Sequence, residues 1–127
     1  YVRKKKIEQM LLHMLKAKLH NGIVTEANIK YTGSITIDSF LLKESGILPY
    51  EKVQVVNINN GERFETYVIE GEAHSGTICL NGAAARLVLP GDRVIIMAFG
   101  LYSQEDAEQL KPPVIILNNK NEIEQRL

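Results

Sequence analysis

The sequence has one cysteine, no excess of charge and no long apolar run, and each absence excludes a class of protein. The lone Cys79 cannot form an internal disulfide, and its place in the apolar run 77–80 favours a buried structural thiol over a nucleophile or redox group. Because 15 basic residues balance 15 acidic ones, nothing indicates a general affinity for nucleic acid or an anionic membrane. No stretch approaches the roughly 18 apolar residues of a membrane-spanning helix, and no secretory signal pattern opens the chain, so we expect a cytoplasmic protein.

At 127 residues the chain has the length of one domain, which can bury roughly two-thirds of its unfolded surface. We expect this single domain over residues 10–127. Residues 1–9 contain the basic run Arg3 to Lys6. We expect a cloning remnant, an alternative start or a disordered N-terminal extension there, rather than a nucleic-acid-binding arm, and assign it no function.

Alternation of apolar and polar residues indicates several short strands. Over residues 14–20 the odd-numbered side chains from 15 to 19 are expected to face a core, which places Lys18 and His20 together on the opposite face. The pair Asn60-Gly61 between two strand-like runs, 53–58 and 63–69, predicts a hairpin. Further strands are expected at residues 77–80, 94–99 and 114–117, with turns at 74–76 and 90–92.

Two short helices are expected between these strands. Asp38 can cap a helix over residues 39–45, which Gly46 then ends. A second helix begins near Ser103 and stops before Pro112. Many short strands with two short helices favour a small closed β-barrel.

Gly33 and Ser34 form the most informative pair in the chain. Gly33 has no Cβ and can hold backbone angles that other residues resist, and the Ser34 hydroxyl stands next to the Gly33 carbonyl. Strain at Gly33, with hydrogen bonds to its carbonyl oxygen, would favour transfer of the acyl group from the Ser34 nitrogen to the Ser34 oxygen. Taken alone, a Gly-Ser pair predicts only an ordinary turn.

The Gly33-Ser34 step is one of five ordered blocks that together have the spacing of one enzyme family. The blocks are Lys16–His20, Tyr31–Ser34, Asn60–Tyr67, Asn81–Ala85 and Gly91-Asp92. Over about residues 10–117 the sequence resembles the pyruvoyl-dependent aspartate alpha-decarboxylases, also called aspartate 1-decarboxylases. The resemblance implies a mainly β fold, a six-stranded double-psi β-barrel with short helices, assembled as a homotetramer with sites between neighbouring subunits.

The resemblance also implies a reaction and its cofactor. The enzyme would be a carboxy-lyase that converts L-aspartate to β-alanine and carbon dioxide for the synthesis of pantothenate and coenzyme A. Its cofactor would be a pyruvoyl group made from Ser34 after autocatalytic cleavage between Gly33 and Ser34, with loss of ammonia. That ketone would form a Schiff base with the substrate amine and accept the electrons released by decarboxylation. Neither pyridoxal phosphate nor a metal is expected, and the need for a maturation factor stays open.

The family pattern assigns a role to several further residues. Thr66 and Asn81 match positions that assist cleavage, although as isolated residues they would be interpreted as a strand residue and a turn residue. Lys18 and Arg63 match cations that anchor the second carboxylate of aspartate, a task for which the planar arginine fork is suited. Tyr67 matches the proton donor that acts after carbon dioxide leaves.

A run of small residues, Asn81 to Ala85, can bring backbone N–H groups close to a ligand. The alternative interpretation is a tight turn leading into a helix. By resemblance, Asn81, Gly82, Ala83 and Ala84 lie beside the pyruvoyl group and bind the substrate, and Thr66 is a further substrate-binding residue. Tyr31 and His20 also match site positions of the family.

Two features do not agree simply with this pattern. Arg63 and Tyr67 share one face of a strand while Thr66 faces the other way, which a bulge, a strong twist or a site shared between subunits would explain. The chain has Val56 where family members have tryptophan, which alters a pocket wall and removes no reacting group. Two non-catalytic alternatives stay open: a β-barrel interaction module that never cleaves, and an unprocessed regulatory relative.

Overall fold

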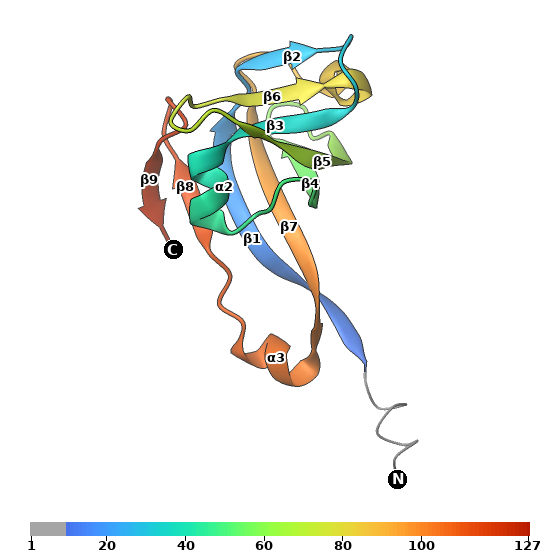
Figure 1. Cartoon of the computed structure of the whole chain (residues 1–127), viewed down its shortest axis with the longest axis vertical. Helices are drawn as coiled ribbons and strands as arrows, with labels where there is room; N and C mark the ends of the chain where they lie inside the picture. The colour runs from blue at the N-terminus through green and yellow to red at the C-terminus, as the bar shows by residue number, and fades with distance from the viewer. Residues whose placement is uncertain (1–9) are drawn as a thin grey trace.

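The computed structural model describes residues 10–127, and the expectation for residues 1–9 lies outside them. Strands dominate the described chain and form one nine-stranded sheet in the order β2-β6-β3-β5-β4-β7-β1-β8-β9 (Figure 1). The strands are β1 (Leu11–Ile23), β2 (Glu26–Asn28), β3 (Ser34–Asp38), β4 (Lys52–Asn57), β5 (Arg63–Gly71), β6 (Ile78–Asn81), β7 (Arg93–Ser103), β8 (Val114–Leu117) and β9 (Ile123–Arg126). The helices are α2 (Ser39–Ser45), the 3₁₀ helix η1 (Gly82–Leu87) and α3 (Gln104–Gln109).

The connection from β1 to β2 requires this sheet to curl. The two strands follow each other in the chain but lie six places apart in the row. In a flat sheet that separation would be about 29 Å. The chain from Ile23 to Glu26 spans at most about 11 Å. The ends of the row must therefore approach each other, which is consistent with a small β-barrel.

The prediction of a mainly β fold with short helices is confirmed, although the structure has nine strands where we expected six. Three strands were not expected. Two lie at the ends of the row, where β2 pairs with β6 and β9 pairs with β8, and the third is β3, which pairs with β5 and β6 inside the row. Within residues 10–127, no helix is long and apolar enough to cross a membrane.

The core side of β1 agrees with the predicted alternation except at one residue. Ala17 and Leu19 are completely buried, whereas Leu15 is half-buried. The pairing of β1 with β7 shifts register between Leu15 and Ala17, so Lys16 is an extra residue at this point. The shift interrupts the strict alternation on which the prediction depended.

The local signals placed the helices and the hairpin correctly. An Asp38 carboxylate oxygen accepts a hydrogen bond from the Phe40 N–H at 2.8 Å, and Gly46 ends α2 with a φ of 78°. Strands β4 and β5 form the expected antiparallel hairpin, in which Gly61 has a φ of 78°. At the start of α3 the Ser103 hydroxyl accepts from the Asp106 N–H at 3.1 Å.

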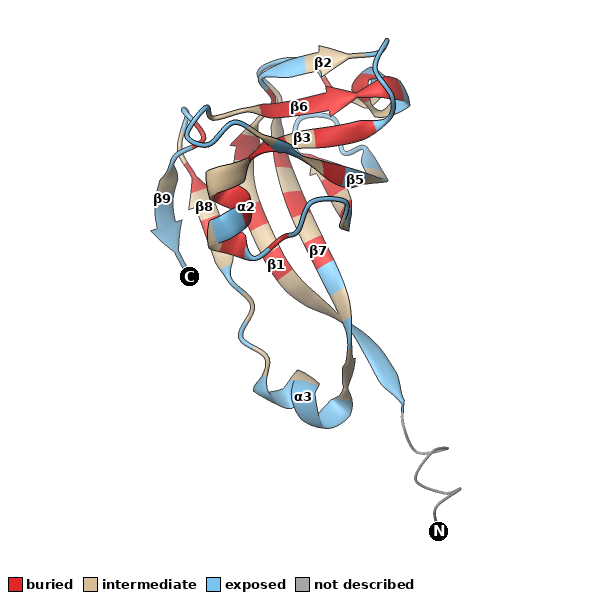
Figure 2. Cartoon of the chain, in the orientation of Figure 1, coloured by how far each residue is buried: buried red, intermediate tan, exposed pale blue. Residues whose placement is uncertain are grey.

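Buried residues gather around β3, β6 and the adjoining parts of β1 and β7, as Figure 2 shows. The far ends of β1 and β7 extend away from this core and carry α3 (Figure 2). Several large apolar side chains on these ends are exposed: Leu11, Leu12, Phe99 and Leu101. The part of the molecule that carries Ser34 is therefore well packed, and the β1–β7 extension is not.

Candidate active site

Ser34 is the first residue of β3 and lies directly opposite Asn81, the last residue of β6. Opposed residues in an antiparallel pair point to the same face, so their side chains meet. The Asn81 Nδ2 donates a hydrogen bond to the Ser34 Oγ at 2.9 Å. Ser34 is completely buried, whereas Gly33 before it is exposed. The peptide bond between them thus lies where the chain enters the core.

Both polar atoms of the Asn81 carboxamide, the nitrogen and the oxygen, form hydrogen bonds. Its Nδ2 also donates to the Thr36 Oγ1 at 3.1 Å, and its Oδ1 accepts from the Cys79 Sγ at 3.3 Å. The Ser34 hydroxyl has only a long contact of 3.5 Å to the Thr32 carbonyl oxygen for its own proton. The serine oxygen is therefore held firmly as an acceptor while its proton is held weakly.

Gly82 packs directly on the backbone that precedes Ser34. A Cβ at Gly82 would lie 2.6 Å from the Gly33 Cα, 2.7 Å from the Gly33 nitrogen and 3.0 Å from the Tyr31 carbonyl oxygen. Gly82 also has a φ of 70°, which disfavours any side chain. The small-residue run and the Gly33-Ser34 step are thus in contact, as the sequence pattern predicts.

The prediction that Gly33 uses its conformational freedom is wrong. Gly33 is not among the glycines with positive φ, and a Cβ built there would have no neighbour within 4 Å. The special backbone angle lies at Gly82 instead, because Gly82 must both turn the chain after β6 and approach the 31–33 segment.

Residues after Gly82 form a short 3₁₀ helix, so the tight turn into a helix is also observed. Ala83 is exposed and Ala84 is half-buried at the start of this helix. Tyr31 contributes its carbonyl oxygen to the contact with Gly82, while its side chain is 62% exposed.

Tyr67 lies level with Ser34 on the neighbouring strand. Strands β3 and β5 are parallel with Ile35 opposite Val68, so the register brings the preceding residues, Ser34 and Tyr67, to the same height. Because Ile35 and Val68 are buried in the core, Ser34 and Tyr67 point to the other face of the sheet. Arg63 is exposed on the same face as Tyr67, as predicted from their spacing.

Thr66 lies on the opposite face from Arg63 and Tyr67, and the structure contains no bulge that would change this. The β4–β5 register is continuous from the pair Lys52–Tyr67 to the pair Val56–Arg63. The bulge offered as an explanation from the sequence is therefore wrong. The same register places Val56, at the tryptophan position of the family, directly opposite Arg63.

Lys18 and His20 lie together on β1, four places from β3 in the row. Burial, and then the positive charge of Lys18, lowers the pKa of His20, so the predicted neighbourhood of these two side chains is confirmed. Within residues 10–127, no hydrogen bond or ion pair joins either of them to Ser34 or Asn81. The structure thus groups Ser34, Asn81 and Gly82, and leaves Lys18 and His20 in a second group.

A hollow of about 320 Å³ adjoins the Ser34–Asn81 pair. Its lining residues come from the outer face of β3, β5 and β6 and from the 26–31 segment: Glu26, Tyr31, Thr36, Ile69, Thr77, Cys79 and Asn81. Burial raises the pKa of the Cys79 thiol, and the negative charge of Glu26 raises it further.

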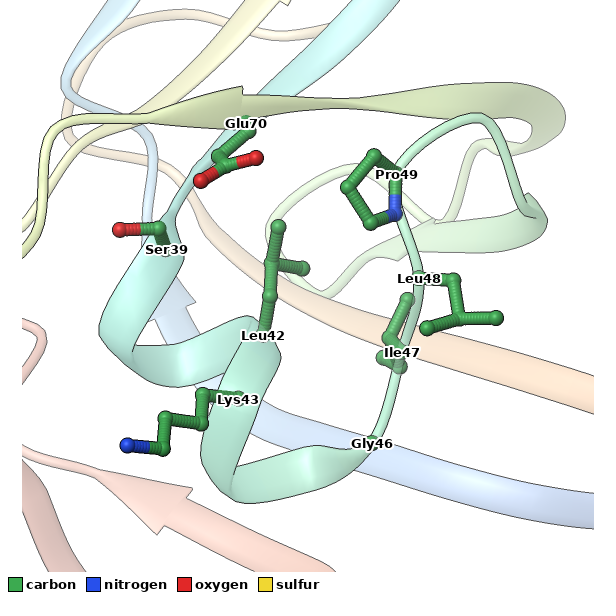
Figure 3. Close-up of a pocket in the computed structure, with 8 residues that line it drawn as sticks. All are labelled: Ser39, Leu42, Lys43, Gly46, Ile47, Leu48, Pro49 and Glu70. Carbon is green, nitrogen blue, oxygen red and sulfur yellow. The ribbon is translucent and has the colours of Figure 1, made fainter.

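A second hollow, beside α2, carries none of the expected site residues. It has a volume of about 270 Å³, and Figure 3 shows Leu42 and Glu70 pointing into the space between the helix and β5. Its walls also include Pro49 and the exposed Leu48. The hollow beside Asn81, in contrast, is lined by two expected site residues, Tyr31 and Asn81, which connects it with the Gly33-Ser34 step.

The sequence pattern alone did not indicate Thr36 and Cys79 as members of the site. Thr36 follows Ser34 by two residues on β3, and Cys79 precedes Asn81 by two residues on β6. The period-2 alternation of a strand places both on the same faces as the two residues already chosen. That signal, applied to Ser34 and Asn81, would have found them.

Comparison with known proteins identifies the class to which this β fold and its serine site belong. The family described as "Aspartate decarboxylase" matches residues 10–124. Proteins named "Aspartate 1-decarboxylase" are 60% identical in Caldicellulosiruptor saccharolyticus, over 90% of this chain and 89% of the relative, and 56% identical in Clostridium botulinum strain Langeland, over 91% of each. A relative with the same name from Clostridium beijerinckii is 55% identical over 91% of this chain and 94% of its own length.

The class is thus that of the decarboxylases. More particularly, the chain belongs to the aspartate decarboxylase family.

Proposed function

We propose that this protein converts L-aspartate to β-alanine and carbon dioxide, with a pyruvoyl group that it makes from its own Ser34. The observation that carries the proposal is the buried Ser34 hydroxyl, held by Asn81 at 2.9 Å beside a Gly33 backbone that Gly82 contacts. The family membership supports the reaction and the substrate. The reaction would belong to pantothenate synthesis and take place in the cytoplasm.

Cleavage would begin when the Ser34 Oγ attacks the Gly33 carbonyl carbon. The bond from that carbon to the Ser34 nitrogen breaks, and an ester to the Ser34 oxygen forms. Elimination then frees the Gly33 carboxylate and leaves a dehydroalanine, and water converts its enamine to the ketone and ammonia. A donor on the serine oxygen favours its loss of a proton, and Asn81 supplies one. The weak contact of the hydroxyl proton to Thr32 leaves that proton free to move.

The residues present fit such a group. The ketone carbon would be the former Ser34 Cα, with its oxygen in place of the former Ser34 nitrogen. The former side-chain carbon would become a methyl group on the side where Asn81 and Thr36 already present an amide and a hydroxyl. The pyruvoyl ketone supplies an electron sink for an amino acid that loses its α-carboxylate. Tyr67, level with Ser34 on the same face, would donate the proton that replaces carbon dioxide on the α-carbon of the substrate. Arg63, on that face too, would bind the remaining carboxylate of the substrate.

The position of Lys18 supports a site made by two copies of the chain. Lys18 and His20 lie on a strand remote from β3 in the row, yet the family pattern assigns both to the site. The exposed apolar side chains at the ends of β1 and β7 offer a surface that a second copy would cover. We infer a homotetramer in which β1 of one subunit completes the active site of its neighbour. A maturation partner, if one is needed, would act on the chain before cleavage is complete.

The test of this function is the intact mass of the purified protein, followed by incubation with L-aspartate. We expect two fragments divided after Gly33, the longer one bearing a pyruvoyl group, and formation of β-alanine. The Ser34→Ala variant should stay whole and inactive. Ser45→Ala is the matched control, because Ser45 is also buried and its hydroxyl bonds only its own helix end. Folded wild-type protein that stays whole, and that hydrazine does not modify, would contradict the proposal.

A further inference from the structure

The Cys79 thiol lies where it can determine how the Asn81 side chain is turned. Both residues are on β6 and point to the same face, and Cys79 is 8% exposed. The Sγ lies 3.3 Å from the Asn81 Oδ1 and 3.9 Å from the Leu80 carbonyl oxygen. The Asn81 oxygen is thus the closer of these two acceptors for the thiol proton.

A carboxamide can turn over and exchange its oxygen with its nitrogen, so something must select one orientation. The hydroxyls of Ser34 and Thr36 both accept from Asn81 Nδ2 here, but a hydroxyl can equally donate, so neither demands this orientation. A thiol is a weak donor and a weak acceptor, and the Cys79 thiol donates to the Asn81 Oδ1 here. With Cys79 donating to Oδ1, the nitrogen of Asn81 faces Ser34.

The surroundings of the thiol keep it in the donating form. Cys79 is buried, and the Glu26 residue opposite it on β2 is acidic. Both burial and the Glu26 charge raise the pKa of Cys79, so the thiol keeps its proton at neutral pH. A thiolate would lose the donor and repel the Asn81 oxygen.

We propose that Cys79 is a positioning residue for self-cleavage, holding the Asn81 carboxamide with its nitrogen toward the Ser34 oxygen. The inference rests on the proposed function, since it concerns the cleavage of the Gly33-Ser34 bond. It assigns a purpose to a thiol that the sequence alone leaves as a packing residue.

The experiment compares Cys79→Val with Cys79→Thr, which have the same shape and differ by a methyl against a hydroxyl donor. Freshly synthesised full-length chains are followed by mass spectrometry as they divide after Gly33, and the Tm of each variant is measured. Loss of the donor should slow cleavage about fivefold in Cys79→Val, and Cys79→Thr should restore it to within about twofold of wild type. Thr77→Val is the control, because Thr77 lines the same hollow and bonds Ser75 rather than Asn81.

Equal cleavage rates in the two variants would overturn the role of Cys79, because packing alone would then account for the residue. If either variant has a lowered Tm, the smaller pair Cys79→Ala and Cys79→Ser gives the same comparison without added volume. Wild-type chains that never divide would overturn the proposed function and this inference together. If wild-type chains divide, and the valine and threonine variants (or the alanine and serine variants) cleave at equal rates, this inference alone is overturned.

Discussion

Replacing Gly82 with alanine tests whether close packing of this residue on the Gly33 backbone prepares the chain for cleavage. The new Cβ would lie 2.6 Å from the Gly33 Cα and 2.7 Å from the Gly33 nitrogen. Carbon atoms in contact normally stay 3.5–4.0 Å apart, so the two segments must separate by about 1 Å. Both are backbone segments, and no flexible side chain can move aside instead.

Two costs contribute to the expected loss of stability. An alanine at the φ of 70° found at Gly82 costs about 1 kcal/mol. Overpacking of a tight contact costs typically about 1–3 kcal/mol more. We therefore expect Gly82→Ala to lower the free energy of unfolding by about 2–4 kcal/mol. Because Gly33 is displaced from Ser34 and Asn81, cleavage should slow by about tenfold or more.

Gly61→Ala separates the two costs. Gly61 has a φ of 78°, nearly that of Gly82, but a Cβ there has no neighbour within 4 Å. This control should lose only about 1 kcal/mol and cleave at the normal rate. Urea unfolding gives the stabilities, measured with Ser34→Ala also present so that every chain stays whole, and mass spectrometry gives the cleavage rates. The reasoning fails if the two glycine variants lose equal stability, or if Gly82→Ala cleaves as fast as wild type.

Two further predictions concern the proposed substrate site. Tyr67→Phe should leave cleavage intact and lower kcat about 100-fold with little change in KM. The control is Tyr50→Phe, on the stacked and more exposed ring 6.5 Å away, which should keep the wild-type kcat. Equal kcat values for the two variants would exclude Tyr67 as the proton donor. Burial and the positive charge of Lys18 lower the pKa of His20 below its ordinary 6.5 in the folded chain. As the pH falls, the unfolded chain therefore binds this proton before the folded chain does. The contribution of His20 to the free energy of unfolding is full above pH 6.5 and is lost as the pH falls through the folded pKa. NMR titration should show the His20 pKa rising in Lys18→Met, and an unchanged value would exclude Lys18 as a cause.

The features of the fold that could be predicted are those determined by neighbouring residues. Asp38 and Gly46 cap α2 through contacts within a few residues, and Asn60-Gly61 turns a hairpin whose strands are adjacent in the chain. The same reasoning missed β2, β3 and β9. Strands β2 and β9 each pair with a single neighbour at an end of the row, and β3 pairs with β5 and β6, which are distant from it in the chain. The many short strands favoured a barrel, but periodicity could not give the order of the strands, because that order joins segments far apart in sequence.

The candidate site follows the same division. The pair Ser34–Asn81 spans 47 residues, and only the family pattern brought it forward before the structure gave the contact. Once that pair is fixed, the alternation along β3 and β6 brings Thr36 and Cys79 into the same network without further information.

The remaining discrepancy concerns the distribution of site residues over two faces and two strands. Thr66 faces away from Tyr67 along a regular strand, and Lys18 lies on β1, remote from Ser34 in the sheet. Neither a local bulge nor rotation of one side chain brings these residues together. A single chain thus has Ser34, Asn81 and Tyr67 together on β3, β6 and β5, and Lys18 with His20 on β1. The proposed assembly of copies would join the two groups, so that the amino-acid pattern of one chain would describe a site to which two chains contribute.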